Sequence, residues 1–440
     1  MTLKNLLKLF ADNNCEKLYV KRLVRNNTSK QQVYVASGDT SVLNVFPLDD
    51  FQSVSNDIAK GATFHARCNF FWIDNEGIKY HAPHAKFILY PKYPEVRFSG
   101  FLKGCKKAPS EILNNPVDGR YIFFGVNNAD QIIGYAADAD SAVANEFEKI
   151  EGLPTVGVLQ YMTVQKSRLV TDTKRILIDT LKSVHAKGWI ESKQLKPGFV
   201  LEPCFGTRCG GLTLEAELNI IQNGKSEPDF LGWEIKQFGV KKFHLLNSAR
   251  VTLMTPEPDS GFYNSAGVID FVKRFGYASK KTEYRMDFTG THRCNVEHNK
   301  TKLTMKVSGF DFEKQTMINP DGGLFLLDGK DNVAAGWSFA KMLSHWNKKH
   351  AQASYIPSLL RVNDSKREYC FSNQIMLGEG TNFNFFLNAF EKGFICYDPG
   401  IKIEDMNQRD TPKARSQFRI SSKHISSLYQ KFEMIDINKF

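Results

Sequence analysis

The stretch Glu227-Pro-Asp-Phe-Leu-Gly-Trp-Glu-Ile-Lys236 decides how this chain of 440 residues is interpreted. It places two carboxylates, Asp229 and Glu234, and one lysine, Lys236, at a spacing that suits a metal-dependent phosphodiesterase. Carboxylate oxygens are ligands for a hard divalent cation such as Mg2+. A lysine beside them can orient an attacking water and offset negative charge on a phosphate. The stretch therefore indicates cleavage of nucleic acid.

The residues between these charges predict a strand over residues 230–238, because they are mainly β-branched and aromatic. Glu234 and Lys236 are two residues apart, so they face the same way on a strand. Asp229 lies five residues before Glu234, which is the wrong parity for an unbroken strand. A kink or bulge at Gly232 would bring all three side chains together.

A fourth acidic residue, Glu215, lies upstream in a predicted helix over residues 213–222. Leu214, Leu218 and Ile221 form its apolar stripe. Glu215 is then on a flank from which it can reach the same metal ion. The alternative reading is an edge strand that carries a solvated glutamate and lysine.

The segment Leu212-Thr-Leu-Glu215, with Glu227 to Lys236, resembles the active site of the MvaI/BcnI family of type II restriction endonucleases, relatives of the mismatch-repair nickase MutH. The resemblance covers roughly residues 170–432. It implies a PD-(D/E)xK nuclease domain over residues 170–440, with Asp229, Glu234 and Glu215 as ligands of Mg2+. Further similar segments are Val251-Thr-Leu-Met-Thr-Pro, Thr289-Gly-Thr-His-Arg293, Gly336-Trp-Ser-Phe339, Tyr397-Asp-Pro-Gly-Ile401 and Ser416-Gln-Phe-Arg-Ile420.

The same resemblance implies which side chains of this domain contact DNA bases. Arginine can pair with guanine, and a carboxylate can accept from cytosine. The sequence departs from the family at Gly400, where an arginine is frequent, and at Lys413-Ala-Arg415, where histidines are frequent. The residues expected at the DNA are His292, Arg293, Asp398, Lys402, Arg409, Arg415 and Arg419.

Composition agrees with a polyanionic partner. The chain has 58 Lys and Arg against 47 Asp and Glu, a net charge of +11. Residues 1–150 hold 18 basic and 16 acidic residues, so most of the excess lies in the remainder. The eight cysteines are scattered, with no spacing that implies a disulfide framework or a zinc site, which suits a reducing cytoplasm. Lys4 and Lys8 interrupt the N-terminal apolar stretch, so neither a signal peptide nor a membrane span is expected.

The first part of the chain predicts an all-β domain over residues 1–165. Short strand-type runs with turn residues between them suggest a small barrel. A helix is expected at 140–150, and the domain boundary at 163–172, before an amphipathic helix at 173–185. The expected strands are residues 17–24, 31–37, 62–74, 86–90, 96–102, 121–126, 132–136 and 154–162.

The second part alternates helices and strands irregularly, which predicts an α/β or α+β core with a mixed sheet. Besides residues 213–222, helices are expected at 337–350, 381–392 and 422–432. Besides residues 230–238, strands are expected at 250–255, 284–289, 302–308, 353–362 and 395–402.

Two polar segments of the first part, Lys21–Asn27 and Pro94–Lys103, join strands to loops whose side chains can contact bases and phosphates. They resemble the two DNA-gripping arms of an EcoRII-N-like effector domain, a β-pseudobarrel. The alternative is a barrel whose loops happen to be basic. The residues that the resemblance assigns to DNA are Lys21, Arg22, Asn26, Asn27, Arg97, Ser99 and Lys103.

Together the two resemblances imply a monomeric type IIE restriction enzyme for a CC-W-GG-like site, which binds two copies of its double-stranded DNA target. Two alternatives remain open. One is a MutH-like strand-specific nickase, against which the additional barrel argues. The other is a non-catalytic DNA-binding regulator, against which the complete acidic and basic set argues.

Overall fold

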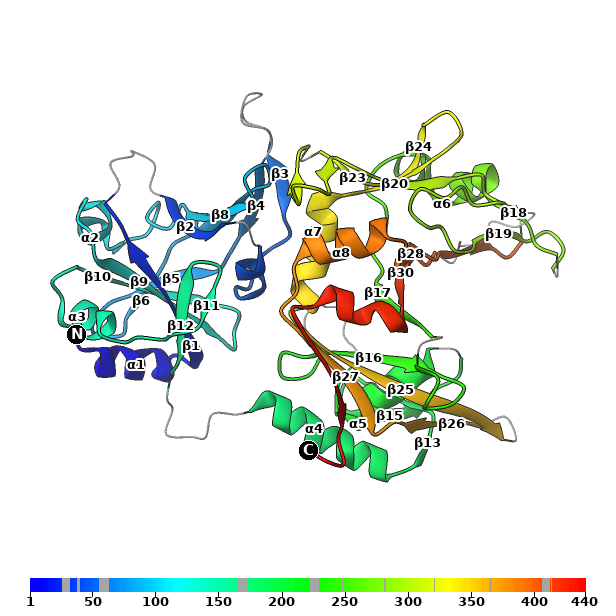
Figure 1. Cartoon of the computed structure of the whole chain (residues 1–440), viewed down its shortest axis with the longest axis horizontal. Coiled ribbons are helices and arrows are strands. Elements are labelled where there is room, and N and C mark those ends of the chain that lie inside the picture. Colours follow the sequence, from blue (N-terminus) through cyan, green and yellow to red (C-terminus); the bar gives the residue numbers. More distant parts are fainter. Residues whose placement is uncertain are drawn as a thin grey trace. The chain divides into compact units, whose positions relative to one another are not determined.

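The computed structural model of the chain describes residues 1–25, 32–37, 40–54, 63–164, 172–206, 208–221, 229–246, 249–280, 282–319, 321–363, 366–405, 412 and 414–440. They belong to two compact units, Met1–Thr171 with Gly309–Asp321, and Asp172–Ser308 with Gly322–Phe440 (Figure 1). Among these described residues, no helix is long and apolar enough to cross a membrane.

The first unit is built mainly from strands. Its elements are α1 (Leu3–Asp12), β1 (Cys15–Leu23), β2 (Gln32–Ser37), η1 (Ser41–Asn44), β3 (Gln52–Val54), β4 (Thr63–Arg67), β5 (Phe70–Ile73), β6 (Lys79–His81), β7 (Lys86–Tyr90), β8 (Glu95–Ser99), α2 (Ser110–Asn114), β9 (Arg120–Asn127), β10 (Ile132–Ala137), α3 (Ala142–Glu148), β11 (Thr155–Val156), β12 (Leu159–Thr163), β21 (Phe310–Asp311) and β22 (Thr316–Met317).

Two sheets organise this unit. A seven-stranded sheet has the order β11-β12-β1-β9-β10-β5-β6, and a five-stranded sheet has the order β2-β8-β7-β4-β3. Leu18 and Val20 alternate into the core from β1 and meet Phe123 of β9, as the two-residue period of a half-buried strand requires. Helix α1 adds Leu6 and Phe10 to the same core, while Lys4 and Lys8 stay exposed.

The second unit contains α4 (Thr173–Ala186), β13 (Trp189–Glu191), β14 (Lys193–Lys196), β15 (Val200–Pro203), α5 (Cys209–Glu217), β16 (Glu234–Gly239), β17 (Arg250–Met254), α6 (Phe262–Phe275), β18 (Tyr277–Ala278), β19 (Met286–Thr289), β20 (Thr304–Ser308), β23 (Gly323–Leu327), β24 (Val333–Ser338), α7 (Phe339–Lys349), β25 (Gln352–Asn363), β26 (Lys366–Phe371), β27 (Gln374–Glu379), α8 (Phe383–Glu391), β28 (Ile395–Tyr397), β29 (Gly400–Ile403), β30 (Phe418–Ser421), η3 (Ser422–Leu428) and β31 (Lys431–Asp436).

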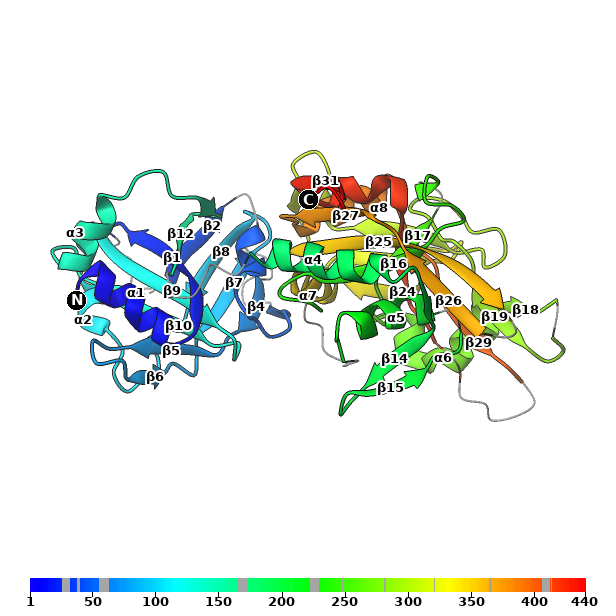
Figure 2. The ribbon, with the colours of Figure 1, turned by 90° about the horizontal axis from the view of Figure 1, so that it is seen from below.

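Its central sheet has the order β13-β26-β25-β27-β31, and β16 pairs with β25 as well. The β16–β25 pair is parallel and the other pairs are antiparallel, so the predicted mixed sheet is confirmed. Helices α4 and α5 pack on this sheet through one apolar cluster that includes Leu177, Leu214, Trp233 and Ile356 (Figure 2). The same cluster thus fixes the strand and the helix that carry the predicted acidic residues.

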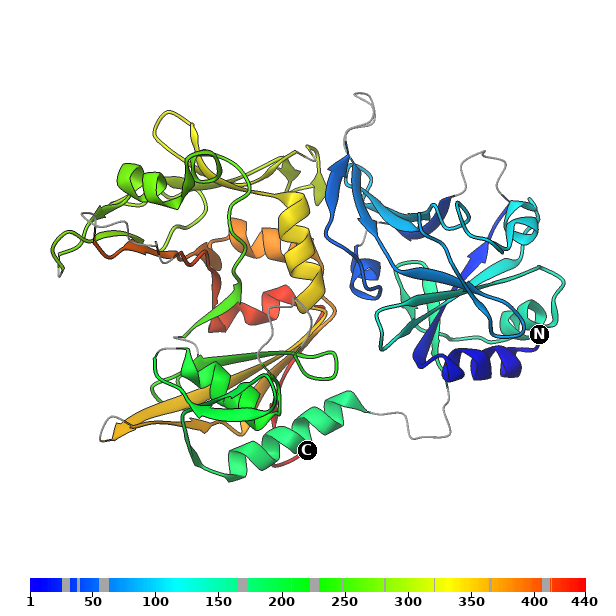
Figure 3. The same ribbon diagram turned by 180° about the vertical axis from the view of Figure 1, so that it is seen from behind.

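Four smaller sheets complete the described part of the unit, with the orders β14-β15, β17-β30-β28, β18-β19-β29 and β20-β23-β24. Helices α7 and α8, yellow and orange in Figure 3, lie side by side. Trp346 of α7 packs against Phe386 of α8 with ring centroids 5.0 Å apart. Helix α7 leads directly into β25, the neighbour of β16.

Several sequence predictions need correction. The predicted strand 62–74 is two strands, β4 and β5, and the strand 395–402 is divided into β28 and β29 at Asp398-Pro399. The helix expected at 213–222 is α5, which begins at Cys209 and ends at Glu217, so Ile221 lies outside it. The helix expected at 422–432 is the short 3-10 helix η3, followed by a strand, β31. Gly336 to Ser338 end a strand, and α7 begins after them.

The cysteine prediction also needs correction. Cys204 and Cys209 form a disulfide, which joins the segment after β15 to the first residue of α5. Both side chains are buried in the core of the second unit. A single pair five residues apart gives no repeated spacing, which is why the sequence did not reveal it.

Candidate active site

The segment between Asp229 and Glu234 reverses the chain in two residues. Phe230 and Trp233 exchange backbone hydrogen bonds, with N–O distances of 2.9 and 2.8 Å. Leu231 and Gly232 between them have φ angles of 48° and 87°, a combination with positive φ at both central positions, as in a type I′ turn. Gly232 adopts this conformation without strain, since it has no Cβ. The predicted break at Gly232 is therefore a tight turn.

This turn returns Asp229 to the start of β16. The Oδ2 atom of Asp229 accepts a hydrogen bond from the backbone N–H of Ile235 at 3.0 Å. Glu234 and Lys236 lie on one face of β16, and the Nζ atom of Lys236 is 2.5 Å from Oε1 of Glu234. The predicted convergence of Asp229, Glu234 and Lys236 is thus present in the structure.

Glu234 is buried, with 1% of its surface exposed. Burial favours the neutral carboxyl, but the neighbouring ammonium groups of Lys236 and Lys349 prevail and hold the pKa of Glu234 below its usual range. Lys349, the last residue of α7, has its Nζ 3.9 Å from the same Oε1 atom. One buried carboxylate therefore faces two lysines from different elements.

Asp229 and Glu215 behave in the opposite way. Burial, then the charge of Glu234, raises the pKa of Asp229 to about 6. Burial, then the charge of Asp229, raises the pKa of Glu215 to about 7. The charges of Asp229 and Glu234 thus act on Glu215 of α5, and the three carboxylates interact electrostatically.

The carboxylates of this cluster are possible ligands for a divalent cation. The described residues include no cluster of three or more His, Cys, Asp or Glu side chains already arranged around one metal position. Within the same residues, however, the buried Oε2 atom of Glu234 has no hydrogen-bond partner. A cation would satisfy this oxygen and relieve the repulsion among Asp229, Glu215 and Glu234, and hard divalent ions prefer such oxygen ligands. By chemistry and charge, these residues fit a divalent metal ion.

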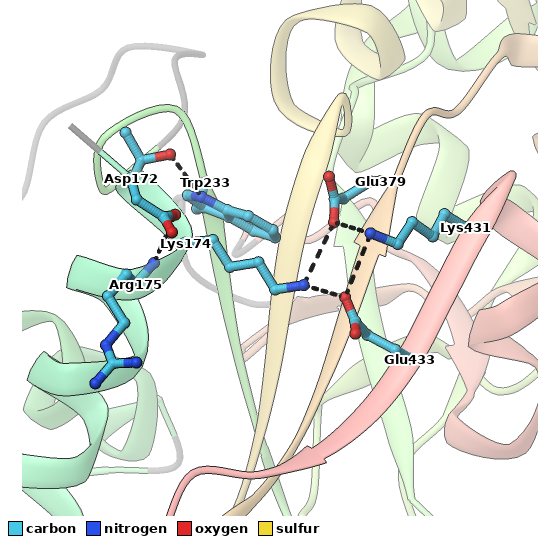
Figure 4. A network of polar contacts seen from close by, with 8 residues as sticks. Asp172, Lys174, Arg175, Trp233, Glu379, Lys431 and Glu433 are labelled. Atoms are coloured by element: carbon cyan, nitrogen blue, oxygen red, sulfur yellow. Dashed lines mark hydrogen bonds and ion pairs between the residues drawn. The ribbon is translucent and has the colours of Figure 1, made fainter. Parts of the chain in front are cut away.

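A polar network links this turn to helix α4 and to the central sheet. The indole Nε1 of Trp233 donates to Oγ1 of Thr173, at 3.3 Å, in the first turn of α4. Lys174 next to it forms ion pairs with Glu379 of β27 and Glu433 of β31 (Figure 4). Lys431 pairs with the same two glutamates. The start of α4 is therefore joined both to the central sheet and to the residue that precedes Glu234.

The segment predicted to read DNA contains β28, which pairs with β30, and β29, which pairs with β19. Backbone hydrogen bonds join Asp398 to Gln417 at 2.8 Å and Gly400 to Arg415 at 2.9 Å. Asp398 accepts from Nη1 of Arg419 at 2.8 Å and lies 3.7 Å from Nη1 of Arg250. Arg250 was not predicted, because it comes from β17, far away in the sequence.

The other residues predicted to contact bases lie in different surroundings. Arg293 and Arg415 are exposed, and Lys402 pairs with Glu404 at 2.6 Å. Arg409 lies outside the described residues. Arg293, Arg415 and Lys402 remain candidates for contacts with DNA.

His292 is a wrong prediction, since it is completely buried. Its Nε2 lies 2.9 Å from Oγ1 of Thr301, and its ring stacks on His298 with centroids 4.2 Å apart. Burial lowers its pKa to about 3, so the ring is neutral. His292 therefore packs in the core of this region.

In the first unit, Arg97 is held firmly. Its Nη1 donates to Gln32 at 3.0 Å, its Nη2 pairs with Glu95, and its guanidinium lies 4.7 Å from the Tyr90 ring centroid. Ser99 is opposite Gln32 in the β2–β8 pair. Of the remaining predicted residues, Arg22 pairs with Glu148 at 3.4 Å, Lys21 has a pKa lowered by burial, Lys103 is exposed, and Asn26 and Asn27 lie outside the described residues.

The site residue that the sequence analysis missed is Lys349. It is 113 positions after Lys236 in the chain, and no motif links the two. Lys349 reaches the site because α7 leads into β25, which pairs with β16.

The MvaI/BcnI restriction endonuclease family matches residues 178–429. The structure resembles restriction endonuclease MvaI in its complex with cognate DNA, with 21% identity, 60% of this chain and 98% of that chain covered, and a TM-score of 0.46. For MvaI without DNA the identity is 22%, the coverage 62% and 100%, and the TM-score 0.34. No curated protein matches the chain. Because the family match covers more than half of the sequence, this chain belongs to the MvaI/BcnI family of type II restriction endonucleases, which are site-specific deoxyribonucleases that generally use divalent metal ions.

Proposed function

We propose that this protein is a Mg2+-dependent restriction endonuclease that cleaves double-stranded DNA with Asp229, Glu234, Lys236 and Glu215. The observation that carries the proposal is the turn at Leu231-Gly232, which brings Asp229 back to the strand on which Glu234 and Lys236 lie. It agrees with the family to which the chain belongs.

When bound, Mg2+ supplies Lewis acidity toward the phosphate and favours deprotonation of water. Asp229 and Glu234 would hold it through carboxylate oxygens, with Glu215 as the third acidic group. The Lys236 ammonium orients the attacking water and stabilises charge on the phosphate. The water oxygen loses a proton to solvent as it forms the new bond to phosphorus, and the 3′ oxygen leaves with the electrons of the broken bond and takes up a proton from solvent. The products carry a 5′-phosphate and a 3′-hydroxyl.

The test is cleavage of plasmid DNA with Mg2+ by Asp229→Asn, Glu234→Gln and Lys236→Met. Each variant should lose about 1000-fold or more in rate, equivalent to several kcal/mol of barrier. DNA affinity measured with Ca2+ should stay close to that of the unaltered protein. Glu191→Gln, an exposed acid on β13, is the matched control and should cleave normally.

The products separate the alternatives. Discrete fragments support a restriction enzyme, nicked circles a MutH-like nickase, and intact plasmid with normal binding a non-catalytic regulator. Cleavage by Lys236→Met at the unaltered rate would contradict the proposed centre.

We further propose that the first unit is an EcoRII-N-like effector module and that the enzyme acts as a monomeric type IIE protein on a CC-W-GG-like site. The layout resembles that of UbaLAI. Support comes from Arg97, which is partly exposed and kept in one orientation by Gln32, Glu95 and Tyr90. Side chains held in this way are suited to reading a groove. The functional domains proposed are residues 1–165 and 170–440, except that Gly309–Asp321 belongs to the first unit.

A further inference from the structure

The topology of the second unit places the C-terminus of α7 beside the catalytic strand. Helix α7 ends at Lys349, and β25 begins at Gln352. Ala353 of β25 is the direct partner of Glu234 in the parallel β16–β25 pair. Only four positions therefore separate Lys349 from the residue that pairs with the buried glutamate.

Two contacts show where the Lys349 side chain lies. Its Nζ is 3.9 Å from Oε1 of Glu234. The Lys236 ammonium is 2.5 Å from the same oxygen. Within the part of the chain that the structure describes, Lys349 forms its ion pair with Glu234. A cation at a helix C-terminus is also favoured by the helix dipole.

The two lysines have different roles during the proposed reaction. Lys236 must face the water and the phosphate in the proposed reaction, and this draws its ammonium away from Glu234. A buried carboxylate that loses its partner costs free energy and is free to move. Lys349 comes from another element and can stay with Glu234 while Lys236 turns to the substrate.

We propose that Lys349 is a positioning residue of the active site, which keeps the Glu234 carboxylate in place while Lys236 acts on the DNA phosphate. This inference rests on the proposed function. It adds a second lysine, contributed by α7, to the Asp, Glu and Lys set. Lys349 acts through Glu234 and does not itself touch the reacting atoms.

The test compares Lys349→Met with Lys349→Arg in the full chain. We expect the cleavage rate at saturating DNA and Mg2+ to fall about 10–100-fold in Lys349→Met, with KM changed less than about twofold. Lys349→Arg, which keeps the charge, should restore most of the rate. Lys341→Met, near the start of the same helix, is the matched control and should behave like the unaltered protein.

A second readout does not depend on cleavage. Terbium binding, followed by luminescence sensitised by tryptophan, should become about 2–10-fold tighter in Lys349→Met, because a positive charge next to a ligand carboxylate is removed. Slower cleavage together with tighter ion binding supports the positioning role. A variant that is only misfolded would lose both cleavage and terbium binding. Loss of both would overturn the positioning role.

The double variant Lys236→Met/Lys349→Met should lose less cleavage rate than the product of the two single losses, because both lysines contact the same Glu234 oxygen and do not act independently. Multiplicative losses, or a rise in KM at unchanged maximal rate, would show an independent phosphate contact and contradict the inference. If Lys236→Met is inactive but Lys349→Met cleaves normally, the inference alone fails. If Glu234→Gln and Lys236→Met both cleave normally, the proposed function itself fails.

Discussion

At the scale of single residues, the ionised acidic cluster lowers the stability of the folded protein. Asp229 and Glu215 are partly buried beside Glu234, which keeps its charge through two lysines. The ordinary carboxyl pKa is about 4, whereas that of Asp229 is raised to about 6. Between these values the native protein binds a proton that the unfolded chain has released, so its stability falls as the pH rises through this window.

Asp229→Asn should therefore stabilise the protein in the absence of divalent ions. Above about pH 6 the ionised aspartate costs on the order of 1–2 kcal/mol. Below about pH 4 the cost is absent, because both states are protonated. Urea unfolding in EDTA should show the variant more stable at pH 8 and equal at pH 4. Equal differences at both pH values would show that the charge of Asp229 is not the cause.

Asp398 presents a second question at this scale, because it is shared by Arg250 and Arg419. If this group reads a base pair, Asp398→Asn should lose about 1–3 kcal/mol on the cognate site and relax preference at one position. Cleavage of duplexes with single base-pair substitutions measures this. The control is Lys330→Gln, an exposed side chain in the β23–β24 turn. A uniform loss on all duplexes would instead identify a structural ion pair or a phosphate contact.

At the scale of elements, the turn before β16 combines a suitable residue with an unsuitable one. Gly232 accepts a positive φ, whereas Leu231 at φ 48° bears a strained backbone and is 51% exposed. Asn-Gly is the preferred pair for such a turn. The leucine therefore contributes strain and little burial at this position.

Leu231→Asn should raise the free energy of unfolding by about 0.5–1 kcal/mol, which corresponds to roughly 1–4 °C in Tm for a unit of this size. Cleavage should be unchanged, because the Leu231 side chain is exposed and carries none of the charged groups of the site. Thermal unfolding monitored by circular dichroism measures the shift. Leu231→Ala serves as control and should not stabilise, since alanine has the same difficulty with positive φ. A lower Tm for the asparagine variant would contradict the turn assignment.

The sequence was informative where a function depends on neighbouring residues. Parity along β16 predicted the shared face of Glu234 and Lys236, and the misfit of Asp229 predicted a break at Gly232. Helix α5 was expected to extend beyond Glu217 because Leu218 and Ile221 continue its apolar period. Lys349 and Arg250 could not be predicted, because pairing of distant strands brings them to their sites. The burial of His292 also depends on tertiary packing, which a polar loop pattern does not reveal.

At the scale of the whole molecule, the first unit consists of two segments of the chain, because Gly309–Asp321 with β21 and β22 groups with Met1–Thr171. A fragment of residues 1–165 would lack the second segment. The proposed effector role is therefore best tested in the full chain.

Arg97→Ala in the full chain should abolish stimulation of cleavage by a second target site and leave cleavage at a single site intact. The reason is that Arg97 and the acidic cluster lie in different units, and coupling between sites is an energy separate from either function. Rates on plasmids with one and two sites measure this. Lys149→Ala, an exposed cation at the end of α3, is the control. Unchanged stimulation in Arg97→Ala would contradict the proposed effector role of the first unit.

The reversal at Leu231-Gly232 also bears on how relatives of such a centre can be recognised. The pairing of Phe230 with Trp233 closes the loop, so the separation of the two carboxylates in space depends on that closing pair and not on the number of residues between them. A chain with a longer loop between the same pair would keep both oxygens in place. Insertions at this point are then compatible with activity, and a motif search with a fixed gap would overlook the proteins that carry them.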